Sequence, residues 1–134
     1  MSRKIYFISH NDFAEGLKRS VEMIAGKQPN VTAYGLEPGG DPNEIVRQIE
    51  ADIATTDTVI ILGDLEGGSV CNAALRLTVR PNVALIAGSN LALALQVVLS
   101  SQTANLDDEI EEARKRIKKL NLKVSAVNDV EGLF

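Results

Sequence analysis

The chain has a single histidine, and its position makes it the first candidate for chemistry. His10 follows the apolar run "IYFIS" and precedes a segment, from Phe13 onward, whose apolar spacing is typical of a helix. A lone histidine is usually an incidental residue. Its significance therefore depends on which other groups the fold brings to it.

An aspartate stands at the corresponding place after another apolar run. Asp64 follows "TVIILG", where a carboxylate either caps the next turn or serves a site. If the two strand ends are neighbours, Asp64 can accept the Nδ1–H of His10, fix its tautomer and leave Nε2 free as a nucleophile. His10 and Asp64 are therefore the predicted catalytic pair.

A glycine pair and a serine form a candidate phosphate-binding turn. Gly67 and Gly68 lead into Ser69 at the start of a predicted helix, where unpaired backbone N–H groups favour an anion. Taken alone, the Gly-Gly-Ser sequence is equally typical of a plain turn followed by a serine N-cap. No lysine follows in a GxxxxGK arrangement, so this is not a nucleotide-binding P-loop. Asn11 and Asn90 stand after two other strands as secondary candidates, and Asn90 also fits a helix N-cap.

Together these residue types suit phosphoryl transfer through a phosphohistidine. That chemistry needs in-line positioning and neutralisation of the equatorial oxygens more than it needs covalent machinery. A serine hydrolase fits poorly, because no G-x-S-x-G elbow is present. A zinc site fits poorly too, since one histidine and the distant Cys71 are too few ligands. We expect neither a metal nor an organic cofactor.

The elements that must position these residues alternate between short β-rich runs and helical periods. Near-continuous apolar runs are typical of parallel strands buried on both faces. The alternation predicts an α/β fold with an open, doubly wound sheet, in which ligands bind at the carboxyl ends of the strands. The predicted strands are 4–9, 31–36, 58–63 and 82–87, followed by a short run at 122–127 that can form one more.

Apolar spacing and capping residues define the helices. Asp12 with Glu15 resembles a capping box, and Asp41 before Pro42 predicts a second helix start. Later helices are expected over 69–78, 90–99 and 106–120. The stripes expected to be buried are Phe13, Leu17, Val21 and Ile24; then Ile45, Ile49 and Ile53; and finally Ile110, Ala113, Ile117 and Leu120.

Bulk composition limits the class of protein. The 134 residues are the size of one domain, 1–134. A formal net charge of −4 argues against nucleic acid as a partner. Cys71 has no second cysteine to pair with, which fits a reducing compartment. The sequence shows neither a secretory leader nor an apolar stretch long enough to span a bilayer, so a cytoplasmic location is expected.

Three motifs in order resemble one family. "ISHNDFAEGL", "LGDLEGGSVCNAALRL" and "IAGSNLALAL" are similar to the enzyme IIA component of the mannose-type bacterial sugar phosphotransferase system, from about Lys4 to Val127. The resemblance implies that His10 accepts a phosphoryl group on Nε2 from the phosphocarrier protein HPr and passes it to a histidine of enzyme IIB. It places Asp64 beside the imidazole. It also implies that Ser69 and the Gly67–Gly68 turn hold the phosphoryl oxygens.

The resemblance also implies an architecture. Four parallel strands are expected in the order 2-1-3-4, with 122–127 as an antiparallel edge strand exchanged between the subunits of a homodimer. Contact with the membrane would be indirect, through the transporter complex. Departures from the family pattern are Ser9 and Asn11, where glycine is common, and Val70 and Ala92, where proline is common.

Three alternatives stay open. A relative of the same fold supplies phosphoryl groups to dihydroxyacetone kinase. A non-catalytic regulatory dimer is another reading, and it predicts that His10→Ala changes nothing measurable. A receiver domain needs an acidic pair after the first strand and a lysine at a late strand end. Here only Asp12 follows the first strand, and "NVALIA" ends without a lysine.

Overall fold

Four parallel strands form the centre of the molecule. The structure is a computed structural model, and it describes residues 3–101 and 103–122. The strand order is β2-β1-β3-β4, which confirms the predicted α/β sheet. The last predicted strand, 122–127, falls almost entirely outside the described residues. The strands are β1 (Arg3–His10), β2 (Val31–Leu36), β3 (Thr58–Gly63) and β4 (Val83–Ile86).

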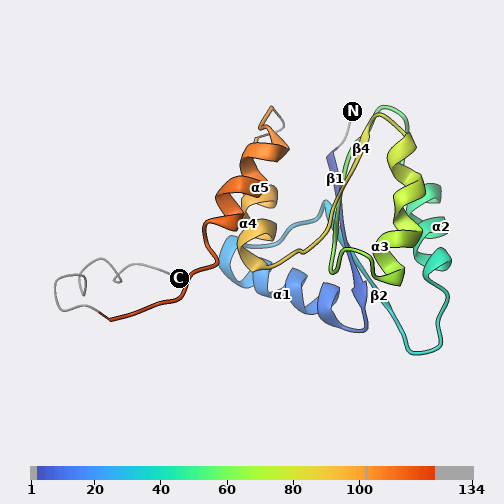
Figure 1. The fold of residues 1–134 in the computed structure, drawn as a ribbon. Coiled ribbons are helices and arrows are strands. Elements are labelled where there is room, and N and C mark those ends of the chain that lie inside the picture. Colours follow the sequence, from blue (N-terminus) through green and yellow to red (C-terminus); the bar gives the residue numbers. More distant parts are fainter. Residues whose placement is uncertain (1–2, 102, 123–134) are drawn as a thin grey trace.

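Helices cover both faces of the sheet. Figure 1 shows α1, α4 and α5 on one side and α2 and α3 on the other. Side chains of β1 alternate between these layers: Ile5 and Phe7 belong to the first core, Tyr6 and Ile8 to the second. No helix in the described ranges has both the length and the apolar character needed to cross a membrane. The helices are α1 (Phe13–Ala25), α2 (Pro42–Asp52), α3 (Ser69–Ala74), the 3₁₀ helix η1 (Leu75–Val79), α4 (Leu91–Leu99) and α5 (Leu106–Arg114).

The buried stripe of α1 is rotated from the predicted one. Leu17 and Val21 are buried as expected, but Ala14 completes the stripe. Phe13 is 48% exposed and Ile24 is 38% exposed, so their assignment to the core is wrong. Both stripes satisfy helical spacing. The small Ala14 faces the sheet, which leaves Phe13 at the carboxyl edge.

The predicted capping box of α1 is also wrong. Asp12 occupies the N-cap position, but its side chain makes no capping hydrogen bond. Instead, the Oγ of Ser9 accepts the N–H of Ala14 at 2.7 Å. Glu15 lies 3.5 Å from Arg19 in an exposed ion pair. One of the orphan N–H groups at the start of the helix, that of Ala14, is therefore satisfied from the strand rather than from the turn.

The start of α2 agrees with the sequence. Asp41 accepts the N–H of Asn43 at 2.9 Å, and Pro42 is the first helical residue. Ile45 and Ile49 are buried as predicted. The N-cap signal worked here because it is local to the chain.

Two helices end earlier than predicted. α3 tightens into η1, and the chain is extended at Arg80, as is usual for the residue before a proline. α5 ends at Arg114 rather than Leu120. Ile117 and Leu120 are 75% and 86% exposed, so their predicted place in the helix seam is wrong. Two pairs four positions apart, Arg114 with Lys118 and Lys115 with Lys119, carry like charges, which disfavours further helix.

Candidate functional site

His10 is the last residue of β1, and the turn that follows it packs against β2. Asn11 has a positive φ of 50°, a conformation that asparagine tolerates better than most residues. Its N–H donates to the carbonyl of Leu36 at 2.7 Å. A Cβ on Gly35 would lie only 2.0 Å from the carbonyl oxygen of Asn11, so glycine is required there. Asn11, predicted as a secondary site residue, therefore shapes the turn beside His10.

Ser9 fixes the same turn from inside the fold and was missed by the sequence analysis. Its side chain is fully buried. The hydroxyl donates to the carbonyl of His10 at 3.0 Å while accepting the N–H of Ala14 at 2.7 Å. A serine shortly before a helix is a capping signal, but Ser9 also completed an apolar strand and was assigned to it.

The predicted pair is formed. His10 Nδ1 lies 2.7 Å from Asp64 Oδ2, and the backbone N–H of His10 donates to the same oxygen at 2.8 Å. This follows from the sheet register, in which Ile8 is opposite Gly63. With Asp64 as acceptor, Nδ1 carries the proton and Nε2 has the free lone pair. The His10 side chain is 48% exposed and that of Asp64 only 14%, so Asp64 orients a ring that partners can reach.

The charge of Asp64 is favoured by this arrangement. Burial acts to raise the pKa of Asp64, but hydrogen bonds from the His10 backbone and ring lower the pKa below its usual value. A lowered folded-state pKa means that this carboxylate stabilises the fold fully above the unfolded pKa of about 4. The contribution is lost as the pH falls through the folded pKa. Asp64 is therefore ionised at neutral pH.

The glycine-serine turn lies against the imidazole. Gly67 has a φ of 80°, which suits glycine. A Cβ on Gly68 would lie 3.2 Å from His10 Cε1, so a glycine lets the ring approach closely. Ser69 Oγ is 3.3 Å from His10 Nε2. The hydroxyl predicted to hold a phosphoryl oxygen is thus beside the nitrogen predicted to carry it.

The backbone N–H groups of this turn fall into two sets, one used inside the turn and one available to a ligand. The N–H of Gly68 donates to the Leu65 carbonyl at 3.1 Å and closes the turn. The Asn72 N–H donates to the Gly68 carbonyl at 2.9 Å, so the N–H groups of Ser69 and Val70 lie before the first helical bond. Gly68 therefore acts through its small size, and an anion would find its backbone donors at the start of α3.

Asn90 has a framework role. Its side chain accepts the N–H of Leu93 at 2.9 Å and caps α4. The N–H of the preceding Ser89 donates to the Gly63 carbonyl at 3.1 Å, which ties this loop to the end of β3. The structure thus gathers His10, Asp64 and Ser69 into one site, with Asn90 at its border.

On the expectation that His10 accepts a phosphoryl group from HPr, as the resemblance implies, Asp64→Ala should slow acceptance without preventing docking. Loss of a charge-assisted hydrogen bond of about 1.5–3 kcal/mol corresponds to roughly 10- to 100-fold in rate. Rapid-quench measurement of single-turnover acceptance from phosphorylated HPr tests this. The control is Asp107→Asn, which removes an exposed carboxylate and should leave the rate unchanged. Asp57 is unsuitable as a control because it is buried. Unchanged kinetics in Asp64→Ala would contradict the assigned role.

Ser9→Ala is expected to destabilise the fold. The Ala14 N–H would lose its acceptor, at a cost of about 1–2 kcal/mol in the free energy of unfolding. Urea unfolding measures the change. Asp12→Ala is the matched control, because the Asp12 side chain makes no capping bond; its stability should stay within about 0.5 kcal/mol of wild type. If Asp12→Ala lowered the free energy of unfolding more than Ser9→Ala does, Asp12 and not Ser9 would be the cap of the helix.

The fold and the site together define a class: an α/β domain with an oriented, accessible histidine at the carboxyl edge of its sheet. Residues 4–114 match the family model described as "PTS system fructose IIA component", and the chain belongs to this family of phosphotransferase-system IIA components. The resemblance found in the sequence is thereby confirmed.

Individual relatives agree with this family. The chain is 34% identical over 105 residues to the sorbose-specific EIIA component of Klebsiella pneumoniae, covering 76% of this chain and 77% of that protein. It is 30% identical over 132 residues to the mannose-specific EIIAB component of Escherichia coli K12, covering 92% of this chain but only 41% of that longer protein. A crystal structure of the IIA protein associated with the fucose utilization operon of Streptococcus pneumoniae is similar with a TM-score of 0.80 at 28% identity, covering 89% of this chain and 93% of that one.

Proposed function

We propose that the chain is a cytoplasmic phosphocarrier that accepts a phosphoryl group from HPr on His10 and passes it to a histidine of enzyme IIB for sugar uptake. One observation carries the proposal. Asp64 holds Nδ1 at 2.7 Å, so that Nε2 is unprotonated and faces the hydroxyl of Ser69 at 3.3 Å. Family membership supports phosphotransfer in sugar transport as the setting.

The proposed step exchanges one phosphorus–nitrogen bond for another. The Nε2 lone pair of His10 attacks phosphorus while the bond to the donor imidazole breaks, and its electron pair returns to that imidazole. The proton on Nδ1 stays on His10 throughout, and the Nδ1–H group keeps its hydrogen bond to the Asp64 carboxylate. The Ser69 hydroxyl and the N–H groups at the start of α3 would offset the charge on the equatorial oxygens. Because the two bonds are of similar energy, the relay itself needs no cofactor.

The test is phosphoenolpyruvate-dependent labelling with purified enzyme I and HPr, followed by mass spectrometry of the intact protein and of the His10 peptide. We expect one added phosphoryl group on His10, stable in alkali and labile in acid. Transfer onward to a cognate enzyme IIB should then discharge it. No acceptance from several HPr donors would overturn the proposal and favour a regulatory dimer.

The predicted homodimer remains part of the proposal. In the part of the chain that the structure describes, β4 is an edge strand, and beside it lies a groove of about 490 Å³. Apolar residues of β4, α4 and α5 line it, which suits an added strand such as 122–127 of a second copy. We expect sedimentation of the full chain to give twice its 14.4 kDa mass. A monomer across the micromolar range would contradict this assembly. Among the apolar side chains lining the groove are Leu85, Ile86, Leu93, Ile110 and Ile117.

A further inference from the structure

The Gly67–Gly68 peptide lies at the centre of the turn beside the imidazole. Gly67 has a φ of 80°, and Gly68 is so close to His10 that a Cβ on it would lie 3.2 Å from the ring Cε1. Two consecutive glycines permit this approach, but they also leave the backbone free to adopt other φ values. A peptide between two glycines can reverse, which exchanges the positions of its carbonyl oxygen and its N–H group. Some other contact must therefore fix the orientation of the turn.

The side chain of Asn72, on α3, makes that contact. Its Nδ2 donates to the Gly67 carbonyl at 3.1 Å. The N–H of the same peptide, on Gly68, donates to the Leu65 carbonyl at 3.1 Å, so both polar groups of the peptide are engaged. The backbone N–H of Asn72 donates to the next carbonyl, that of Gly68, at 2.9 Å. One residue therefore holds two successive carbonyl groups of the turn.

The preceding residue on α3 holds the other end of the same loop. Cys71 is buried, and its Sγ packs over Gly63, where it leaves no room for a Cβ. Gly63 is the last residue of β3 and is followed directly by Asp64. α3 therefore holds the loop of residues 64–68 at both ends. Asn72 itself is exposed and fills no space in the core, so its contribution to the loop is its hydrogen bonding.

The orientation of the turn decides where two groups of the site lie. Gly68 is packed against Cε1 of His10, and the Oγ of the next residue, Ser69, is 3.3 Å from Nε2. A reversal of the Gly67–Gly68 peptide would change the φ of Gly68 and would move the ring contact and the hydroxyl together. Misplacement of a group by about 1 Å can cost about 100-fold in rate. The site therefore depends on a turn that its own glycines do not fix.

We propose that Asn72 is a positioning residue for phosphoryl acceptance, an inference that rests on the proposed function. By holding the Gly67 carbonyl, its amide keeps the turn in the orientation that places the Ser69 hydroxyl beside Nε2 of His10. Asn72 acts through the turn and not on the phosphoryl group itself. Its removal slows the transfer step and leaves the docking of HPr intact.

The experiment measures single-turnover acceptance from phosphorylated HPr over a range of HPr concentrations, which separates transfer from docking. Asn72→Ala should lower the maximal rate by about tenfold or more, and the half-saturating HPr concentration should stay within about twofold of wild type. Asn72→Leu should behave in the same way. Leucine keeps the bulk of the side chain and is a good helix former, but it has no hydrogen to donate.

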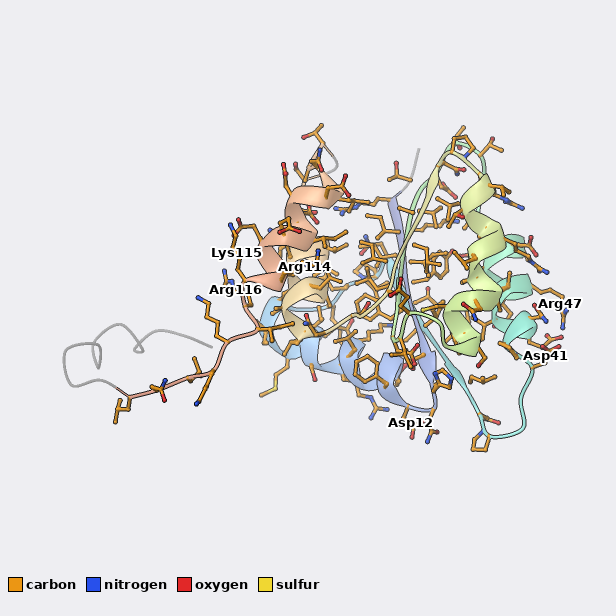
Figure 2. The ribbon with its side chains drawn as sticks, in the orientation of Figure 1. Asp12, Asp41, Arg47, Arg114, Lys115 and Arg116 are labelled. Carbon is orange, nitrogen blue, oxygen red and sulfur yellow. The ribbon has the colours of Figure 1, made fainter. Side chains whose placement is uncertain are left out.

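Asn82→Ala is the matched control. Asn82 directly precedes β4, and its Nδ2 also donates to two backbone carbonyls, those of Ala54 at 3.0 Å and Asp57 at 2.9 Å. Because the strands are parallel, Asn82 lies at the edge where they begin, opposite the edge where β1 ends and where Figure 2 shows Asp12. Its urea midpoint should fall at least as far as that of the first variant, while its maximal rate should stay within about twofold of wild type.

The single histidine gives a second readout that does not depend on phosphorylation. The chain has one imidazole Hε1 resonance, and this proton is bonded to the Cε1 that Gly68 approaches. In the NMR spectrum at neutral pH, Asn72→Ala should shift the Hε1 signal of His10. Asn82→Ala should leave the signal where it is in the wild-type protein.

The proposal requires both effects. It is overturned if either Asn72 variant keeps the wild-type maximal rate, if the Hε1 signal does not move in Asn72→Ala, or if Asn82→Ala slows acceptance as much. Failure of the proposed function is a different result, because wild-type protein would then accept nothing from HPr. The role in transfer would fall with it, while the Hε1 signal would still report whether Asn72 holds the turn.

Discussion

His10→Gln is expected to abolish phosphorylation while leaving the fold in place. Glutamine keeps an amide that can reach toward Asp64, but it has no ring nitrogen with a nucleophilic lone pair. His10 is half exposed at the end of β1, so little core packing depends on it. After incubation with phosphoenolpyruvate, enzyme I and HPr, the intact mass of the variant should show no added phosphoryl group.

The variant also separates the alternatives. Its free energy of unfolding should stay within about 1–2 kcal/mol of wild type, the scale of one lost hydrogen bond. A phosphoryl group retained by His10→Gln would refute His10 as the acceptor. If that label were lost in alkali, it would indicate an acyl phosphate such as a receiver domain forms. A cell phenotype unchanged by His10→Ala would favour the regulatory dimer.

The sheet and the contact between His10 and Asp64 could be predicted from the sequence because they depend on short-range signals. Each buried strand is an apolar run, and each run ends at a polar residue that can be read directly. Parallel topology then brings His10 and Asp64 to one edge without any knowledge of side-chain contacts. The Asp41 cap was accessible for the same reason, since donor and acceptor lie two residues apart.

The features that were missed depend on contacts between distant segments. Nothing local to Gly35 reveals that the carbonyl of Asn11 passes over it, and nothing local to Ser9 shows that its hydroxyl faces into the fold. The α1 stripe was assigned to Phe13 because a large apolar side chain fits a core, yet Ala14 lies against the sheet. Ile117 has helical spacing but meets no core in the described part of the chain.

Gly35→Ala is expected to damage both stability and transfer. The new Cβ would lie 2.0 Å from the Asn11 carbonyl oxygen. Real Cβ atoms essentially never approach a non-bonded atom within 3.0 Å. The turn would have to move by about 1 Å, and the 2.7 Å bond from Asn11 to Leu36 would be strained or broken. Overpacking of this kind costs about 1–3 kcal/mol in unfolding free energy. Because His10 is the residue before Asn11, a 1 Å displacement should also slow acceptance by about 100-fold.

Gly16→Ala is the control that isolates the steric cause. Gly16 lies inside α1, and a Cβ there meets nothing within 4 Å. Alanine is the better helix former, so the free energy of unfolding of this variant should rise by about 0.5–1 kcal/mol. Urea unfolding at equal protein concentration measures this change. The same chemical change therefore has opposite signs at the two positions. The prediction is wrong if Gly35→Ala is as stable as Gly16→Ala and accepts phosphoryl groups at the wild-type rate. That result would mean that the turn after His10 can move away from β2 at no cost.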